Sequence, residues 1–194
     1  MKLFIYSLLI TITWFPVSTA MGKSPLSAYV TDLTSADIVY NWSTNSTELK
    51  CLCFKPNSSE MSKLVVYRQV KGKMKRIFVA ETGGFPFSIQ NVNGNIVTVW
   101  ETATGYLIYT FGYQNGMVIE YFHDGSYIQP EFAYLGSSQN RSIIVSKFDW
   151  VVDPKTNDRT RVPISANIYT WAGKSYTKHE VVQWEKRLKS PGGN

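Results

Sequence analysis

Acidic residues in the middle of the chain are the first side chains that could do chemistry. Glycoside hydrolysis needs only two carboxyl groups, one acting as an acid and the other as a base or nucleophile. The residues that could supply such a pair are Glu101, Glu120, Asp124, Glu131 and Asp149. No motif favours one pair over another, so we expect these side chains mainly to solvate the surface. A carbohydrate-acting hydrolase that uses paired carboxylates is the alternative function.

The two histidines do not complete a known catalytic or metal-binding pattern. His123 precedes Asp124 and Gly125, which indicates a hairpin, and His179 lies between two charged residues, which indicates an exposed position. The sequence has no G-x-S-x-G motif for a serine nucleophile and no H-E-x-x-H motif for zinc. We therefore expect no catalytic residues, no metal site and no cofactor.

The only cysteines are Cys51 and Cys53, with Leu52 between them. On a strand, residues two apart share one face, so both thiols would point the same way. A buried or strained pair of thiols, a disulfide between them and a redox role are all open from the sequence. Pairing at this spacing fits the usual disulfide geometry poorly, so we favour the buried pair.

Aromatic residues and one long polar segment indicate binding rather than catalysis. Tyr and Trp dominate the binding hot spots of protein interfaces, and aromatic faces also stack on sugars. The segment Phe148–Asp153 runs into a polar insertion, 153–163, which we expect to be an exposed loop. Loops of this kind often carry function. The candidate binding residues are Asp149, Trp150 and Asp153, followed by Tyr113 and Asn115 in a predicted hairpin.

The first twenty residues have the order of a secretory signal peptide. Lys2 precedes an apolar run, Leu3–Phe15, and small residues lie at Ser18 and Ala20. The alternative, a transmembrane anchor, requires roughly 20 apolar residues, and this run is shorter. We expect cleavage after Ala20 and export to the periplasm or beyond the cell, with no segment that spans a membrane.

The remaining segment, 21–194, fits a single domain with a sizeable core. The whole chain has a formal net charge of +6, which loss of Lys2 lowers to +5. The basic residues are spread out, apart from small clusters at 71–76 and 186–189. We interpret this modest excess as solvated surface and expect no nucleic-acid partner.

Short segments rich in β-branched and aromatic residues predict an all-β fold. They lie at 64–67, 77–79, 95–100, 106–111, 117–122, 142–146 and 167–171. Residues that tolerate positive φ separate them, at Asn93–Gly94, 114–116, Asp124–Gly125 and Ala172–Gly173. Residues 35–40 and 181–188 fit either a helix or a strand.

A weak internal repeat becomes visible when the hairpins are aligned on an aliphatic residue followed by tyrosine. The pairs are Val66–Tyr67, Ile108–Tyr109 and Ile168–Tyr169, and a further strand is expected before each, at 49–54, 96–100 and 143–148. Several strands per unit predict antiparallel sheets in a propeller-like arrangement or in an open stack or sandwich. Because about three units are too few to close a propeller, the open arrangements compete with it.

The segments Asn91–Val99 and Ile168–Tyr176 resemble the blades of bacterial exported β-repeat proteins of the FG-GAP and VCBS type. The resemblance covers about residues 85–185 and implies an exported repeat fold. In that family, aspartates of a D-x-N-G-D loop hold calcium, whereas this chain has Asn91, Asn93 and Asn95. Because calcium prefers charged carboxylate ligands, we expect no calcium here.

These observations together predict an exported, non-enzymatic binding module. We expect its partner to be a protein or a glycan of the envelope or the extracellular space. An inhibitor or immunity-type protein, which blocks an enzyme by inserting a loop, is the sharpest form of this hypothesis.

Overall fold

The computed structural model describes residues 25–44, 47–153 and 155–182. The predicted signal peptide and its cleavage site lie outside the described residues, as do residues 183–188 of the segment for which helix and strand were both open.

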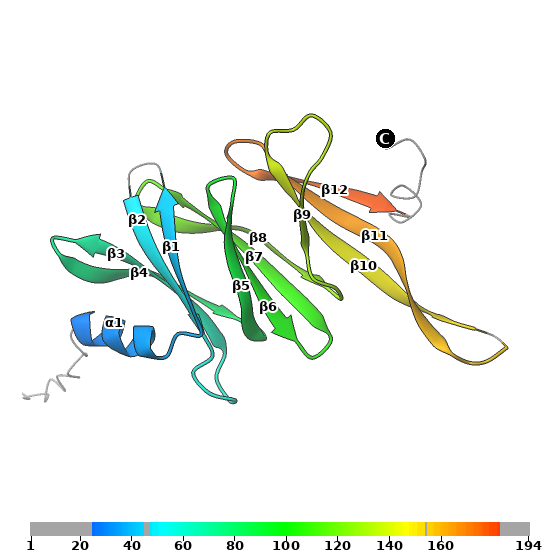
Figure 1. Cartoon of the computed structure of the whole chain (residues 1–194), viewed down its shortest axis with the longest axis horizontal. Coiled ribbons are helices and arrows are strands. Elements are labelled where there is room, and N and C mark those ends of the chain that lie inside the picture. The colour runs from blue at the N-terminus through cyan, green and yellow to red at the C-terminus, as the bar shows by residue number, and fades with distance from the viewer. Residues whose placement is uncertain (1–24, 45–46, 154, 183–194) are drawn as a thin grey trace, which may run out of the picture.

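The described chain is almost entirely β, as the sequence predicts (Figure 1). Its twelve strands form three four-stranded antiparallel sheets, each a meander of consecutive strands. Sheet A contains β1 (Ile38–Thr44), β2 (Thr47–Phe54), β3 (Ser62–Val70) and β4 (Lys73–Thr82). Sheet B contains β5 (Phe85–Val92), β6 (Asn95–Thr102), β7 (Gly105–Gln114) and β8 (Met117–Ser126). Sheet C contains β9 (Glu131–Tyr134), β10 (Arg141–Val152), β11 (Arg159–Trp171) and β12 (Tyr176–Val182).

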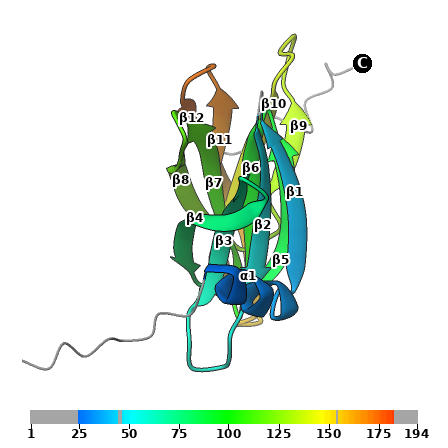
Figure 2. The same cartoon turned by 90° about the vertical axis from the view of Figure 1, so that its left-hand side faces the viewer.

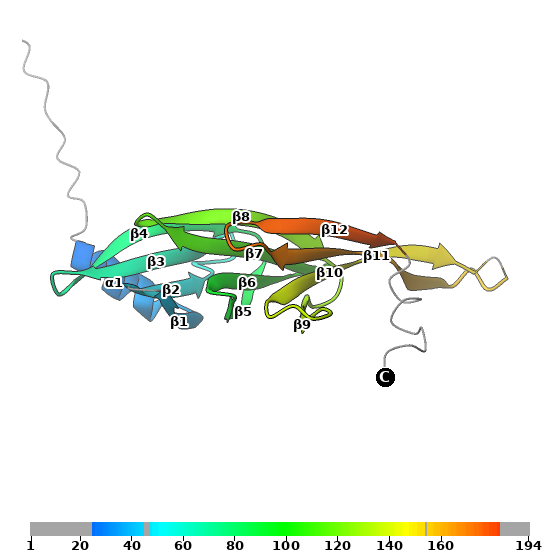
Figure 3. The ribbon, with the colours of Figure 1, turned by 90° about the horizontal axis from the view of Figure 1, so that it is seen from above.

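The sheets form an open stack with sheet B in the middle (Figure 3). One core cluster joins sheets A and B through side chains such as Trp42, Leu64 and Trp100. A second joins sheets B and C through Val97, Ile143 and Tyr169. Strand β6 contributes alternate residues to both clusters and is buried from Asn95 to Trp100, which explains its nearly continuous apolar sequence. Of the arrangements left open by the sequence, the structure has the stacked one.

The predicted repeat corresponds to the sheets. The three aliphatic–tyrosine pairs lie on β3, β7 and β11, each the third strand of its sheet in chain order. The strands expected before them are β2, β6 and β10, each the second strand of its sheet. One repeat unit is therefore one four-stranded meander.

Helix α1 (Pro25–Thr34) covers the outer face of sheet A (Figure 2). Proline is favourable in the first turn of a helix because its missing N–H would have no intrahelical partner there. Tyr29 and Leu33, four residues apart, lie on one face of the helix and pack against buried residues of β2 and β3, including Leu52 and Tyr67. The segment 35–40, ambiguous in the sequence, contains the connection after α1 and the start of β1.

Two expectations about turns are wrong. Asp124 and Gly125 lie within β8 rather than in a turn, because the Asp124 carboxylate binds groups of sheet C. The segment 153–163 is not all loop, since β11 begins at Arg159 and pairs with the end of β10. The other predicted turns are confirmed, with positive φ at Asn93, Gly94, Asn115, Gly116 and Gly173.

The side chains of Asn93 and Asp124 fix sheet C against sheet B by hydrogen bonds. The amide of Asn93 donates to Arg141 O at 2.8 Å and accepts from Arg141 N at 2.9 Å, as a neighbouring strand would. Asp124 accepts from Lys147, Asn167 and Tyr169 at 2.5, 2.7 and 2.8 Å. The relative position of the two sheets is therefore set by hydrogen bonds as well as by apolar packing.

Candidate functional site

A groove lies over the hairpin turns at one end of the stack. We call it the turn groove. Its volume is about 620 Å³, and it is lined by the β1–β2, β5–β6, β7–β8 and β11–β12 hairpins together with Arg68 of β3 and Tyr121 of β8. All three sheets therefore contribute to it.

The topology explains why these turns meet. A four-stranded meander returns the chain to the end of the sheet from which it started, so the first turns of sheets A and B lie at the same end of the stack. Stacking then brings turns that are distant in sequence side by side. The turns themselves depend on Asn93, Asn115 and the glycines after them, which tolerate the required positive φ.

The wall between sheets A and B is held by two side-chain hydrogen bonds. Trp42 Nε1 donates to Gly94 O at 3.0 Å, and Arg68 Nη1 donates to the Tyr113 hydroxyl at 2.9 Å. The Trp42 and Tyr113 rings meet edge to face, with their centroids 6.2 Å apart. Because Trp42 is fully buried, this wall is anchored in the core.

The wall between sheets B and C is aromatic. Tyr121 and Trp171 line the groove, and their rings form a triangle with that of Tyr176. The centroid separations are 5.2 Å for Tyr121–Trp171, 5.0 Å for Trp171–Tyr176 and 5.8 Å for Tyr121–Tyr176. Gln114 Nε2 donates to the Tyr121 hydroxyl at 2.6 Å, and Asn95 Nδ2 donates to the Tyr176 hydroxyl at 3.3 Å. Burial raises the pKa of Tyr176 to about 12 and also raises that of Tyr121, so both hydroxyls are neutral at physiological pH.

The polar groups of the turn groove are hydroxyls, amides and turn backbone. Of its described lining residues, Arg68 alone carries a charge, and none carries a carboxylate. Amides and hydroxyls can both donate and accept hydrogen bonds, so the groove suits a polar ligand that carries both donors and acceptors. It does not supply the paired carboxylates that glycoside hydrolysis needs.

The structure separates the residues predicted from the sequence into two groups. Tyr113 and Asn115 both line the turn groove. Asp149, Trp150 and Asp153 instead lie on the β10–β11 hairpin, which projects beyond the other strands (Figure 1). There, Asp149 and Asp153 accept hydrogen bonds from the backbone N–H groups of Trp150 and Lys155, both at 2.7 Å. Both carboxylates thus stabilise the local backbone of the hairpin.

Sequence reasoning missed Arg68, Tyr121 and Trp171 as site residues. Trp171 directly precedes the predicted turn at Ala172–Gly173, just as Tyr113 lies shortly before Asn115–Gly116. An aromatic residue beside a glycine turn was therefore an available signal. Arg68 and Tyr121 had no such signal, because their place depends on how the sheets stack.

The candidate acids of a hydrolase do not meet in a groove. Glu101, Glu131 and Asp149 are exposed, and Glu120 contacts His123 at 2.7 Å on the surface of β8. Burial acts to raise the pKa of Asp124. The hydrogen bonds that its carboxylate accepts from Lys147, Asn167, Tyr169 and the backbone N–H of Gly125 outweigh this effect and leave the pKa below its usual value. Asp124 therefore stays ionised, and its carboxylate already accepts four hydrogen bonds, which suits a structural role.

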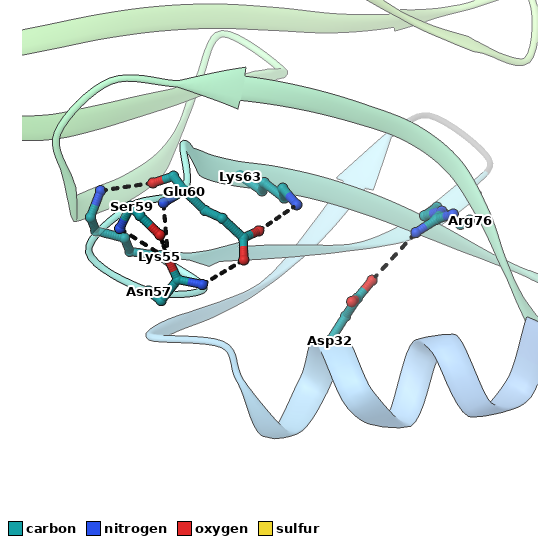
Figure 4. Close-up of polar contacts among 7 residues, drawn as sticks. All are labelled: Asp32, Lys55, Asn57, Ser59, Glu60, Lys63 and Arg76. Carbon is teal, nitrogen blue, oxygen red and sulfur yellow. Dashed lines mark hydrogen bonds and ion pairs between the residues drawn. The ribbon is translucent and has the colours of Figure 1, made fainter. Parts of the chain in front are cut away.

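A second cleft, beside α1, does contain acids, namely Asp32, Glu60 and Glu81. Asp32 accepts from the Tyr67 hydroxyl at 2.5 Å and pairs with Arg76 at 3.9 Å. Glu60 pairs with Lys63 at 3.4 Å and accepts from Asn57, so these contacts order the β2–β3 loop (Figure 4). Two of the three acids are therefore engaged in holding α1 and the loop against sheet A.

Comparison with known proteins identifies no relative: no protein family, no curated protein and no solved structure matches the chain. The resemblance to FG-GAP and VCBS repeats therefore stays a prediction. Among the described residues, no three His, Cys, Asp or Glu side chains are grouped as a metal site would require. The single described helix is too short and too polar to cross a bilayer.

Proposed function

We propose that the protein is an exported, non-enzymatic binding module that holds a glycan in the turn groove. The observation that carries this proposal is the combination of an aromatic wall with a lining of amides and hydroxyls that contains no carboxylate. A sugar ring has an apolar face and a rim of hydroxyls. The first suits an aromatic ring, and the second suits groups that donate and accept hydrogen bonds.

The dimensions of the groove support a small or chain-like ligand. Its volume of about 620 Å³ falls in the range of roughly 300–1,000 Å³ that is usual for ligand pockets. A protein partner would more commonly bind through a flat or protruding apolar patch, and the groove is hollow and polar.

The groove is also organised before any ligand arrives. Trp42, Arg68 and Gln114 each hold a lining residue by a hydrogen bond, and the aromatic triangle packs three rings together. A preorganised site loses less conformational freedom on binding, which improves affinity. The predicted export would place this site among glycans of the envelope or the extracellular medium.

Binding of the mature chain, residues 21–194, to an array of oligosaccharides tests the proposal. We expect capture of at least one structural class of glycan, confirmed by titration calorimetry with the soluble sugar. Absence of any glycan binding by folded protein would contradict the proposal. Release of reducing sugar from a bound glycan would instead support the hydrolase alternative.

The projecting β10–β11 hairpin supports a second candidate function, that of a protein inhibitor. Trp150, Val152 and Ile164 on this hairpin have exposed fractions of 49%, 45% and 45%. Apolar side chains on a projecting hairpin could enter the cleft of a partner. Replacing residues 153–158 by Asn-Gly, which favours a tight hairpin, should abolish capture of a partner protein from envelope extract while leaving glycan binding unchanged. Unchanged capture would contradict this candidate.

A further inference from the structure

We infer that the turn groove selects an acidic glycan, with Arg68 binding the carboxylate of a uronic or nonulosonic sugar. This inference rests on the proposed glycan-binding function and adds the class of its ligand.

The guanidinium of Arg68 has hydrogen-bond donors that the described part of the chain does not use. Arg68 lies on β3, partly buried at the edge of the groove, and its one side-chain hydrogen bond among the described residues goes to the Tyr113 hydroxyl at 2.9 Å. It forms no ion pair with a described acid. A guanidinium has five N–H donors, so most of its donors remain available to a ligand.

The described lining of the groove is positively charged. Arg68 is the one charged side chain of the described groove lining, and burial raises the pKa of Tyr121 in the same lining. Nothing in this lining therefore offsets the positive charge. The whole chain is also basic, with a net charge of +6, so an anionic ligand is attracted at longer range as well.

The guanidinium of Arg68 is also held in one orientation. Its bond to Tyr113 fixes it relative to sheet B, and Tyr113 in turn packs on the buried Trp42. An oriented guanidinium can bind both oxygens of a planar carboxylate at once, which a mobile lysine ammonium cannot do. Asn115 and the hydroxyls of Ser43 and Thr47 line the same groove and can bind the hydroxyls of the sugar that carries the carboxylate.

Titration calorimetry with matched acidic and neutral sugars tests the inference. One pair is tetragalacturonic acid and its carboxyl-reduced counterpart, and the other is sialyllactose and lactose. For one pair, we expect the acidic member to bind about tenfold or more tightly than the neutral one, since hydrogen bonds to charged groups are the stronger ones. A preference for tetragalacturonic acid would identify a uronic acid as the ligand, and a preference for sialyllactose would identify a nonulosonic acid.

Substitutions then assign the preference to Arg68. Arg68→Gln can still donate to Tyr113 but has no charge, so the acidic and the neutral member should bind this variant with similar affinity. Arg68→Lys should keep part of the preference, and this part should shrink between ~50 and ~500 mM salt. Lys73→Gln, an equal loss of charge at an exposed position of β4 outside the groove, is the matched control and should change nothing.

Failure of the acidic preference can be told apart from failure of the proposed glycan binding. Equal binding of acidic and neutral members, or a preference that survives in folded Arg68→Gln, would overturn the inference while leaving the glycan-binding function in place. Absence of binding to every sugar tested here and on the array would overturn both.

Discussion

The hydroxyl of Tyr169 donates a 2.8 Å hydrogen bond to Oδ2 of Asp124, and it thereby joins β11 of sheet C to β8 of sheet B. The Tyr169 ring stacks on Phe122 with a centroid separation of 3.8 Å, and Lys147 pairs with the same carboxylate at 2.5 Å. Because Trp171 follows Tyr169 by two residues on β11, this junction also sets the position of the aromatic wall of the turn groove.

Replacement of Asp124 by Asn should destabilise the protein by about 2 to 3 kcal/mol, since it leaves the ammonium of Lys147 without a countercharge in a partly buried site. Asp158→Asn, the same change of charge at an exposed loop position, is the control and should lie within about 0.5 kcal/mol of the parent. Urea unfolding measures both. Equal stability of the two variants would show that the junction contributes little.

The stabilisation from Asp124 should disappear in acid. Burial acts to raise the pKa of Asp124, but the hydrogen bonds from Lys147, Asn167 and Tyr169 hold it below the usual value in the folded protein. The unfolded state, with a pKa of about 3.9, therefore binds the proton first as the pH falls. The difference in melting temperature between the parent and Asp124→Asn should be constant above about pH 5 and should shrink below about pH 4. A difference that grows in acid would contradict the assignment.

Two asparagines with the same backbone conformation should differ in their importance for stability. Asn93 and Asn115 have φ of 55° and 50°, but only Asn93 exchanges hydrogen bonds with another sheet, through the backbone of Arg141. Asn93→Ala should cost about 1 to 2 kcal/mol more than Asn115→Ala, because it leaves two backbone groups without their partners. Equal losses in urea unfolding would show that the backbone conformation alone matters.

The thiols of Cys51 and Cys53 should be unreactive in the folded protein. Both are free and almost fully buried, 0% and 1% exposed. Burial raises the pKa of Cys53 to about 12, helped by the nearby charge of Asp37, and burial also raises that of Cys51. A thiol reagent at pH 8 should therefore label two thiols only after denaturation. Rapid labelling of native protein, or no labelling of denatured protein, would refute the buried-thiol structure.

Much of the architecture could be predicted because it depends on local sequence. Runs of β-branched and aromatic residues between glycine turns identify the strands around Val66, Ile108 and Ile168, and the aliphatic–tyrosine repeat corresponds to one sheet per unit. Helix α1 was missed because its stability depends on packing against sheet A. Asp124–Gly125 has the composition of a turn, and the strand there is fixed by its pairing with β7, at Ile108 and Leu107, and by contacts from sheet C, such as that of Lys147.

The candidate site could be predicted only in part for the same reason. Tyr113 and Asn115 belong to a turn that the sequence indicates, and both line the groove. Arg68 lies 45 residues from Tyr113 in the chain, and only the stacking of sheets A and B brings them together. The hairpin that carries Asp149 and Trp150 was recognised as exposed, but its distance from the groove follows from the topology of sheet C.

The measurement that tests the central claim most directly is the affinity of Trp171→Ala for the glycan that the array identifies, beside Trp150→Ala. Both variants lose one indole, but Trp171 lines the turn groove, whereas Trp150 lies on the projecting hairpin. Loss of a stacking aromatic should weaken binding about tenfold or more in Trp171→Ala and should leave Trp150→Ala within about twofold of the parent, provided that both variants melt cooperatively. Unchanged affinity in folded Trp171→Ala, or a larger loss in Trp150→Ala, would contradict the assignment of glycan binding to the turn groove.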